Sequence, residues 1–457
     1  MAGDSSLEAF RSRNMFLAGY WLYRSYRAGR LPGVTLELTP VQYYRDITRR
    51  YDSFEDIDVY RRQESLYSAG RLAVTQNFDI LGGQFFLNSD IGFMRSLGDK
   101  AVNQYTSTPV RVGYLQSLLG YNPFKWERKI EPLKFEKAKK DFLYNMEVIS
   151  EQAAAYFFDL AMAQAEYDMA VDNVASTDTL YRVGEERQKI ASITKADLLT
   201  LRLDAVNARN TLLNAEMGVK RAMFALASYL NLDKDAVIRV RLPGHPVKQT
   251  ISAAEALMYA RENNPGFAGF EGRILEAEQQ VDRARKEAMF DASLSLSIGF
   301  NQVASSLSGA YRSPLQQDVV AVSLSIPLVD WGVRKGKYNM ARNTLNIARI
   351  SAREEEAALE EDLIITVGDF NIRQQLIASA EEALDLSIMA YGETRERFMI
   401  GKADINSLTL SLSREQEAER NYVGALRAYQ LSYYKIRRLT LYDFFLNMPI
   451  SRAFDYE

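Results

Sequence analysis

The sequence VAVSLSIPLVDWGV occupies residues 320–333 and changes its hydrophobic period part-way along. Up to Ile326, valine, leucine and isoleucine alternate with alanine and serine, which is the pattern of a β-strand with one apolar face. We expect this strand over about residues 319–328. After Trp331-Gly332, apolar residues recur at helical spacing and predict one long helix over about residues 333–400.

A second segment alternates in the same way. Large apolar residues take every other position from Leu294 to Phe300, so a strand is expected at about 292–300. The first half of the chain repeats the alternation within residues 33–118. One face would be apolar and the other small and polar, as in a membrane strand between lipid and lumen. A strand of a soluble sandwich gives the same pattern, so the alternation alone leaves both classes open.

Heptads fill most of the remaining chain. Apolar residues are spaced alternately by four and three from Phe142 to Val174 and again from Leu198 to Tyr229, which predicts two antiparallel coiled-coil helices. At 1.5 Å per residue, the longest helices would reach roughly 95 to 100 Å. The long helices are expected at about 128–190, 195–231, 252–290, 333–400 and 403–439.

The two halves of the chain are related by duplication. Lys195-Ala196-Asp197 recurs as Lys402-Ala403-Asp404, and Trp126 matches Trp331 at similar strand-to-helix junctions. Residues 1–250 therefore form a first structural repeat and residues 251–457 a second. The first repeat carries an extra segment, roughly residues 39–108. The sequence leaves open whether this segment forms additional strands, an external cap or a plug in the lumen.

Composition excludes several classes of function. The chain has no cysteine and one histidine, which excludes thiol catalysis and metal sites built from Cys or clustered His. Its net charge of −3 argues against a nucleic-acid partner. No run of about 18 apolar residues predicts a transmembrane helix. The first residues lack the features of a secretory signal, so the protein is either cytosolic or shown without its signal.

The sequence contains no recognisable catalytic or ligand-binding motif. The acidic cluster from Glu354 to Asp362 is expected to be the solvated face of a helix, and His245 lies in a turn where a lone histidine is expected to be structural or incidental. We therefore expect no enzyme activity, no cofactor and no metal.

The number of strands limits how they can be arranged in a membrane. A membrane barrel needs at least about eight strands and has no open edge in lipid. Each half of this chain offers two clear strands, with two more conceivable in the extra segment. One chain cannot close a barrel, so several identical chains would share one, with cyclic symmetry.

Five motifs carry a family resemblance, and the match in the duplicated order of helices and strands covers nearly the whole chain. Three of them, Ile326–Arg334, Arg397–Ile405 and Asn263-Asn264-Pro265, resemble the TolC family of outer-membrane efflux proteins. The other two, Gly120–Trp126 and Arg438–Phe444, are similar to a branch of that family found in Bacteroidetes-type bacteria.

The resemblance implies a mainly α fold with a membrane β-barrel part. The TolC-like order is a duplicated helix, strand, strand, helix, helix, with long antiparallel coiled-coil helices forming a tunnel and a homotrimer closing a 12-stranded barrel. The barrel would lie in the outer membrane and the tunnel in the periplasm. The protein would be the exit duct of a tripartite efflux pump or type I secretion system, with a periplasmic adaptor (membrane fusion) protein and an inner-membrane pump. The alternative is a soluble coiled-coil scaffold or adaptor.

The two helix-to-helix turns, residues 190–198 and 400–408, are expected at the closed end of the tunnel. By resemblance the family's tip glycine is Gly401, and in the first half its place falls on Ala191 or Thr194, depending on register. The acidic residue expected six positions later falls on Ser407 in the second half. The gate candidates, whose charges form either interchain ion pairs or ordinary solvated turns, are Lys195, Asp197, Arg397, Gly401, Lys402, Asp404 and Ser407.

Overall fold

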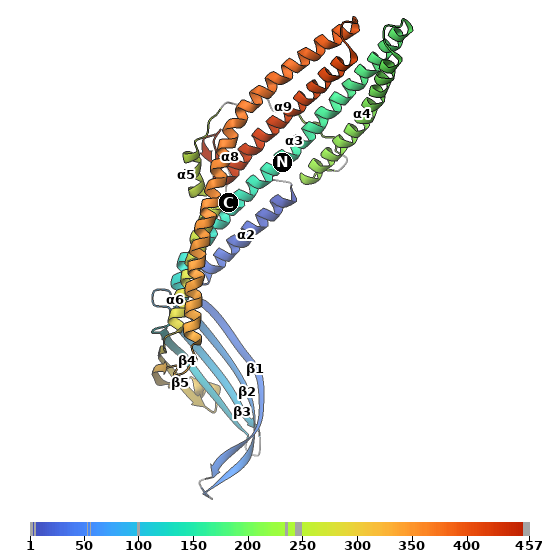
Figure 1. Ribbon diagram of the computed structural model, residues 1–457. Helices are drawn as coiled ribbons and strands as arrows, with labels where there is room; N and C mark the ends of the chain where they lie inside the picture. The colour runs from blue at the N-terminus through green and yellow to red at the C-terminus, as the bar shows by residue number, and fades with distance from the viewer. Residues whose placement is uncertain are drawn as a thin grey trace. The chain divides into compact units, whose positions relative to one another are not determined.

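The computed structural model describes residue 3 and residues 6–52, 54, 56–97, 101–233, 236–242 and 249–450. His245 lies outside these described residues. The helices are α2 (Leu7–Ala28), α3 (Pro123–Lys189), α4 (Lys195–Tyr229), α5 (Ala253–Asn263), α6 (Pro265–Glu287), α7 (Leu307–Ala310), α8 (Val333–Met399) and α9 (Ile405–Thr440) (Figure 1). The strands are β1 (Gly33–Asp52), β2 (Ile57–Phe78), β3 (Gly83–Leu97), β4 (Val102–Ser117), β5 (Asp291–Ala304), β6 (Leu315–Ser325), β7 (Tyr442–Asp443) and β8 (Met448–Pro449).

The same elements recur in the same order in both halves of the chain. α2, β1, β4, α3 and α4 are followed later by their counterparts α6, β5, β6, α8 and α9. The counterparts also match in length, since α3 and α8 each have 67 residues, while α4 has 35 and α9 has 36. Among the described residues of the second half, β2 and β3 have no counterpart. The extra segment of the first half therefore forms additional strands.

The chain divides into two compact units that do not follow its halves. One unit contains residues 1–18, 136–269 and 353–457 and is made mostly of long helices. The other contains residues 19–135 and 270–352 and includes β1 to β6. Each repeat thus supplies helices to the first unit and strands to the second. The repeat boundary near residue 250 stays a prediction.

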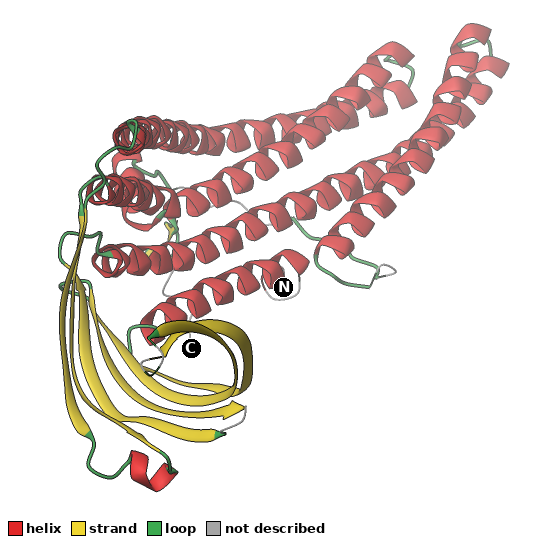
Figure 2. Cartoon of the chain, turned by 90° about the horizontal axis from the view of Figure 1, so that it is seen from below, coloured by secondary structure: helices red, strands yellow, loops and turns green. Residues whose placement is uncertain are grey.

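β1 to β6 form one antiparallel sheet in chain order. β4 and β5 come from different halves of the chain and pair directly, with Val112 opposite Ile298. The sheet curves in one direction across its strands (Figure 2). Three copies of the chain would close a 12-stranded barrel with four strands each, whereas this sheet has six strands, so the strand number of the barrel stays a prediction. The sheet has more strands than expected because the extra segment pairs along its length instead of forming a cap or plug.

The two faces of this sheet differ in chemistry. Leu294 lies opposite Val322, while Ser293 lies opposite Ser323, so apolar residues share one face and serines the other. This pairing confirms the predicted alternation. The apolar face extends over all six strands, and its exposed members include Val34, Leu36, Leu38, Leu72, Phe85, Leu87, Val112, Leu296, Ile298, Val320, Val322 and Leu324.

Charged groups cross the opposite face at one level. Arg71 of β2 lies between Glu37 of β1 and Asp90 of β3, with Nε 2.5 Å from Asp90 Oδ1 and Nη1 3.8 Å from Glu37 Oε2. Further along, Arg111 of β4 donates to Gln317 Oε1 of β6 at 2.8 Å. Such groups are stable only beside water or paired partners. This face is therefore the polar face of the sheet.

The helical unit places its four longest helices side by side in the order α4, α3, α9, α8 (Figure 1). Ion pairs connect the neighbours, from Arg209 to Asp178, from Arg427 to Asp159 and from Lys435 to Asp362. The heptad residues of α4 that face α3, such as Leu201 and Ala208, are buried as expected. None of the described helices is both long and apolar enough to cross a membrane.

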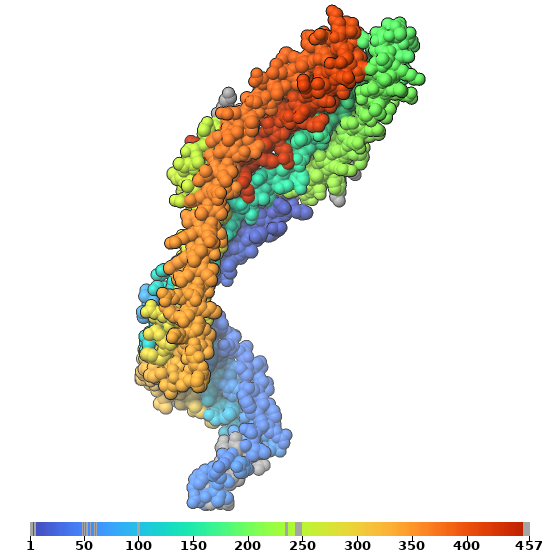
Figure 3. All heavy atoms as spheres, viewed as in Figure 1, coloured from blue at the N-terminus to red at the C-terminus, as the bar shows by residue number. Residues whose placement is uncertain are grey.

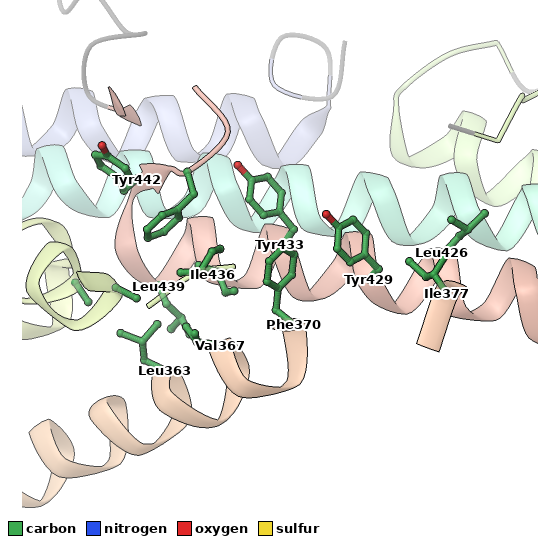
Figure 4. Close-up of a cluster of buried hydrophobic side chains, with 14 of the residues drawn as sticks. Leu363, Val367, Phe370, Ile377, Leu426, Tyr429, Tyr433, Ile436, Leu439 and Tyr442 are labelled. Carbon is green, nitrogen blue, oxygen red and sulfur yellow. The ribbon is translucent and has the colours of Figure 1, made fainter. Parts of the chain in front are cut away.

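An aromatic core joins α5, α8, α9 and the segment after α9 (Figure 4). Phe370 of α8 and Tyr429 of α9 stack with ring centroids 5.0 Å apart, and Tyr433 donates to Asp443 Oδ1 at 2.7 Å. Arg437 pairs with the buried Glu147 of α3 at 3.0 Å and with Asp443 at 3.3 Å. These paired buried charges fix α9 and the segment that follows it against α3.

Residues 252–290 form two helices rather than the single expected one. α5 ends at Asn263 and α6 begins at Pro265, because Asn264 is extended with φ −69° and ψ 131°. A residue before proline disfavours the helical conformation. The Asn264 side chain supports the break, since it donates to the Leu439 carbonyl and accepts from the Gly266 N–H, both at 2.8 Å.

Candidate functional site

The candidate gate consists of the two turns at one end of the helical unit. Here the α3–α4 hairpin and the α8–α9 hairpin lie side by side (Figure 3). Arg397 is in the last turn of α8, Gly401 and Lys402 are in the following turn, Asp404 caps α9 and Ser407 is in its first turn. Lys195 and Asp197 are in the first turn of α4. The seven candidates therefore lie at the two helix-to-helix turns, at the same end of the helical unit.

Both hairpins turn with the same backbone hydrogen bond. The N–H of Ser192 donates to the carbonyl of Arg187 at 2.9 Å, and the N–H of Lys402 donates to the carbonyl of Arg397 at 2.8 Å. This is the closing bond of a Schellman motif, which needs a residue in the left-handed conformation after the helix. The two turns are structural equivalents.

The left-handed residue differs between the turns. It is Gly401, with φ 79°, after α8 and Ala191, with φ 56°, after α3. Ala191 therefore takes the glycine position in the first half, and Thr194 does not. A residue that has a Cβ atom pays a conformational free energy of about 1–2 kcal/mol in the left-handed conformation.

The helices that follow begin with complementary caps. In the first turn Thr194 is the N-cap, and Thr194 and Asp197 hydrogen-bond reciprocally, with Asp197 N–H to Thr194 Oγ1 at 3.1 Å and Thr194 N–H to Asp197 Oδ2 at 2.9 Å. In the second turn Asp404 is the N-cap and accepts from the Ser407 N–H at 2.7 Å. Hydrogen bonds from Thr194 lower the pKa of Asp197, and those from Ser407 lower the pKa of Asp404.

These caps correct the repeat alignment made from identical residues. Lys195-Ala196-Asp197 starts inside α4, directly after its N-cap, whereas Lys402-Ala403-Asp404 ends at the N-cap of α9. Trp126 and Trp331 are not equivalent either. Trp126 lies in α3 and donates to Asp282 Oδ2 at 2.8 Å, while Trp331 lies in the turn before α8 with φ 52°.

Within the part of one chain that the structure describes, the basic candidates have no charged partner. Among the described residues, Lys195, Arg397 and Lys402 form no ion pair. The carboxylates of Asp197 and Asp404 are engaged in their own turns. One chain therefore brings the candidates to the tip but does not pair them with each other.

Arg187 is a tip residue that the sequence analysis missed. Its Nη2 donates to the carbonyls of Phe398 at 2.7 Å and Met399 at 3.0 Å, at the end of α8. The guanidinium also lies over the buried Phe398 ring, 5.0 Å from its centroid. Arginine at a helix C-terminus satisfies unpaired carbonyls and complements the helix dipole. The repeated Glu-Arg pair before each turn, Glu186-Arg187 and Glu396-Arg397, was the available signal.

A second contact between the hairpins lies beside an open cavity. The hydroxyls of Ser176 on α3 and Tyr391 on α8 are 2.9 Å apart. The adjoining cavity, of about 980 Å³, is lined by residues of α3, α8 and α9, including Asp172, Glu415 and Glu419. Burial, followed by the charges of Asp168 and Asp172, raises the pKa of Glu419. Burial and then Glu419 raise the pKa of Glu415.

The described residues contain no group of three or more acidic or histidine side chains arranged to hold a metal ion. The tip chemistry is instead that of hydrogen bonds, helix caps and charged side chains. Such groups hold the two hairpins together at the tip.

The sequence profile of the family described as "Outer membrane efflux protein" matches residues 257–440. Residues 257–440 are thus similar to this family of efflux proteins. The match confirms the resemblance at the level of the family, which is one of ducts and not of enzymes. The narrower assignment to a Bacteroidetes-type branch stays a prediction.

Solved structures extend the likeness in fold to 96% of the chain. The outer membrane protein VceC from Vibrio cholerae is 16% identical with a TM-score of 0.68, over 96% of this chain and 94% of that one. A membrane protein from Pseudomonas aeruginosa is 14% identical with a TM-score of 0.69, over 96% and 91%. The CmeC outer membrane channel of Campylobacter jejuni is 12% identical with a TM-score of 0.68, over 96% and 84%. No curated protein matches the sequence.

Proposed function

We propose that this efflux protein is an outer-membrane exit duct through which solutes pass without chemical change. The carrying observation is a six-stranded sheet with one exposed apolar face and one polar face. Hydrocarbon can cover the apolar face, whereas water would leave it as a large exposed patch. The helical unit would then lie in the periplasm as the tunnel.

The exposure of the apolar face also bears on the scaffold alternative. In a soluble scaffold the strands would pack against helices of the same chain. Val34, Leu36 and Val320 instead expose 66%, 66% and 76% of their surface. The duct is therefore the better supported function.

Three copies of the chain would close the tunnel laterally. The outermost helices α4 and α8 carry rows of exposed apolar residues at heptad-like spacing, which are Leu199, Leu203, Val206, Leu213 and Met217 on α4 and Ile365, Ile372, Leu376 and Leu386 on α8. Packing α4 of one copy against α8 of the next would bury both rows. A ring of three such contacts is closed.

The duct would work with a periplasmic adaptor and an inner-membrane pump, in efflux or in type I secretion. Support comes from the family match and from relatives whose names are those of outer-membrane channels. Co-purification of the full chain with both partners is the experiment that tests this assembly.

The tip turns would form the gate of this duct. With threefold symmetry, three copies of Lys195, Arg397 and Lys402 meet three copies of Asp197 and Asp404 at the closed end. Interchain pairs there would contribute about 0.2–1 kcal/mol each. Their threefold repetition would keep the open state rare until an adaptor binds it better.

Membrane fractionation tests the duct against the scaffold. We expect the full chain in the outer-membrane fraction, soluble only in detergent, with the mass of a trimer and with channel activity in planar bilayers. Recovery from the aqueous fraction without detergent would contradict the proposal. A detergent-soluble monomer that inserts into bilayers would contradict the trimer.

A further inference from the structure

Two edges of the six-stranded sheet have no partner within the described chain. β1 pairs only with β2, and β6 pairs only with β5. Each edge therefore presents a row of backbone N–H and carbonyl groups. In hydrocarbon such groups cost several kcal/mol each, so a membrane sheet cannot keep these edges open.

The two edges are complementary in direction. The sheet is antiparallel throughout and has an even number of strands, so β1 and β6 run in opposite directions. β6 of one copy can therefore pair with β1 of the next and continue the antiparallel order. β6 has 11 residues, which is the length that a tilted strand needs to cross the hydrocarbon.

The apolar band runs obliquely across the sheet. Val322 of β6 pairs with Leu294 of β5, and Leu294 in turn pairs with Gln116 of β4. Val322 therefore lies at the level of the end of β4 that leads to α3. On β1 the apolar row extends from Val34 to Leu38, away from that end. A band level with the membrane therefore requires tilted strands. Tilt of this kind is what a closed barrel needs.

We propose that β1 of each copy pairs with β6 of its neighbour, so that three copies close an eighteen-stranded barrel. This inference rests on the proposed function, which sets the number of copies at three. Barrel diameter grows roughly linearly with strand number, so the lumen is about one and a half times as wide as that of a twelve-stranded barrel of equal tilt. The paired charges Glu37, Arg71 and Asp90 then face the lumen.

A twelve-stranded barrel from β3 to β6 alone is the competing arrangement. It would require β1 and β2 to leave the sheet. β3 is paired with β2 along all of its 15 residues, and the apolar face continues onto Leu72 and Leu36. Separating β2 from β3 would break the backbone hydrogen bonds between them. It would also take the apolar residues of β1 and β2 out of the lipid.

Disulfide cross-linking in outer membranes distinguishes the two barrels, because the chain has no native cysteine. The serine on the polar face of β6 is changed as Ser323→Cys and combined with a scan of β1, Thr35→Cys, Glu37→Cys and Thr39→Cys. Matched pairs combine Ser323→Cys with β3 positions Asn88→Cys or Asp90→Cys. Single-cysteine variants are the controls.

We expect oxidation to convert the monomer band into covalent dimer and trimer for at least one β1–β6 pair and for no β3–β6 pair. Cross-linking through β3 would overturn the proposal in favour of twelve strands. Absence of all cross-links in a protein that fractionates with outer membranes as a trimer would also overturn it, and a strand count by electron cryomicroscopy of that trimer would identify the actual closure. Recovery in the aqueous fraction would instead overturn the proposed function.

Discussion

Ala191 is poorly suited to its backbone conformation, because a left-handed alanine is strained where Gly401 is not. We expect Ala191→Gly to stabilise the first turn by about 1 kcal/mol and Gly401→Ala to destabilise the second by a similar amount. Space is not the cause at Gly401, since an added Cβ would meet nothing nearer than Arg187 at 3.5 Å. Amide hydrogen exchange at the two turns measures both effects. Faster exchange in Ala191→Gly than in the unchanged protein would contradict the prediction.

Ala191 also explains why the sequence alone did not identify the residue of the first turn that takes the glycine position, Ala191 or Thr194. Where a helix ends in a left-handed residue, that residue is usually glycine, and here alanine removes that signal. The backbone bond from Ser192 to Arg187 fixes the register in the structure. The capping pairs could have been recognised, since Thr194 and Asp197 have capping-box spacing. The identical Lys-Ala-Asp triplets predicted a different alignment of the two halves. That alignment is wrong because the equivalent N-cap residues are Thr194 and Asp404, which differ in identity.

At the scale of elements, Arg187 links the α3–α4 hairpin to the end of α8. Arg187→Ala removes two charge-assisted hydrogen bonds and the contact with Phe398, so we expect the hairpins to separate more often. Single-channel conductance in planar bilayers should rise. Lys189→Ala is the matched control, because this exposed cation of the same helix turn pairs only locally with Glu186. Equal conductance in both variants would exclude Arg187 from the gate.

To test the charges of the second turn, a variant must remove them without removing the hydrogen bond that caps α9. Asp404→Ala with Lys402→Ala removes the proposed interchain charges but also the hydrogen bond that caps α9. Loss of an N-cap alone costs about 0.5–2 kcal/mol. Asp404→Ser with Lys402→Ala keeps a capping side chain, and we still expect higher conductance and greater leakage of large antibiotics into cells. If only the alanine pair leaked, the cap and not the charge would be responsible.

The acidic cavity between α3 and α9 gives a pH dependence with a defined sign. Burial raises the pKa of Glu419 above 4.5, so the folded state binds protons more tightly than the unfolded chain. The protonated Glu419 therefore contributes its full stabilisation to the folded state below the ordinary glutamate pKa. This contribution is lost as the pH rises through the raised pKa of the folded state. Amide exchange around Glu419, corrected for its intrinsic rate, should be faster at about pH 7.5 than at about pH 5.

Glu419→Gln should remove this difference between the two pH values. Glu417→Gln changes an exposed carboxylate two residues away and serves as the control, so it should leave the difference intact. A pH effect that survives Glu419→Gln would have to arise from Glu415, whose pKa is also raised by burial.

At the scale of the molecule, the longest helices were predictable, whereas the break at Asn264 and the number of strands in the sheet were not. Heptads specify long helices directly, and α8 covers 333–399 where about 333–400 was expected. β3 hides its alternation because Phe86 lies on the polar face. The ring of Phe86 packs over Gly113, which has no side chain, so the pair is compact although each residue breaks the pattern. The number of strands then depends on long-range pairing that no local period reports.

The orientation of the sheet in the membrane follows from its two faces. If the apolar face meets lipid, Leu296→Cys should react with a membrane-impermeant maleimide much more slowly than Ser295→Cys, its neighbour on the opposite face. Leu296→Arg should destabilise the inserted protein by about 2–4 kcal/mol near the bilayer midplane, whereas Ser295→Arg should cost little because a lumen side chain keeps its water. Equal labelling rates at both positions would mean that the apolar face meets water, and the sheet would then have to bury that face against another protein surface rather than lipid.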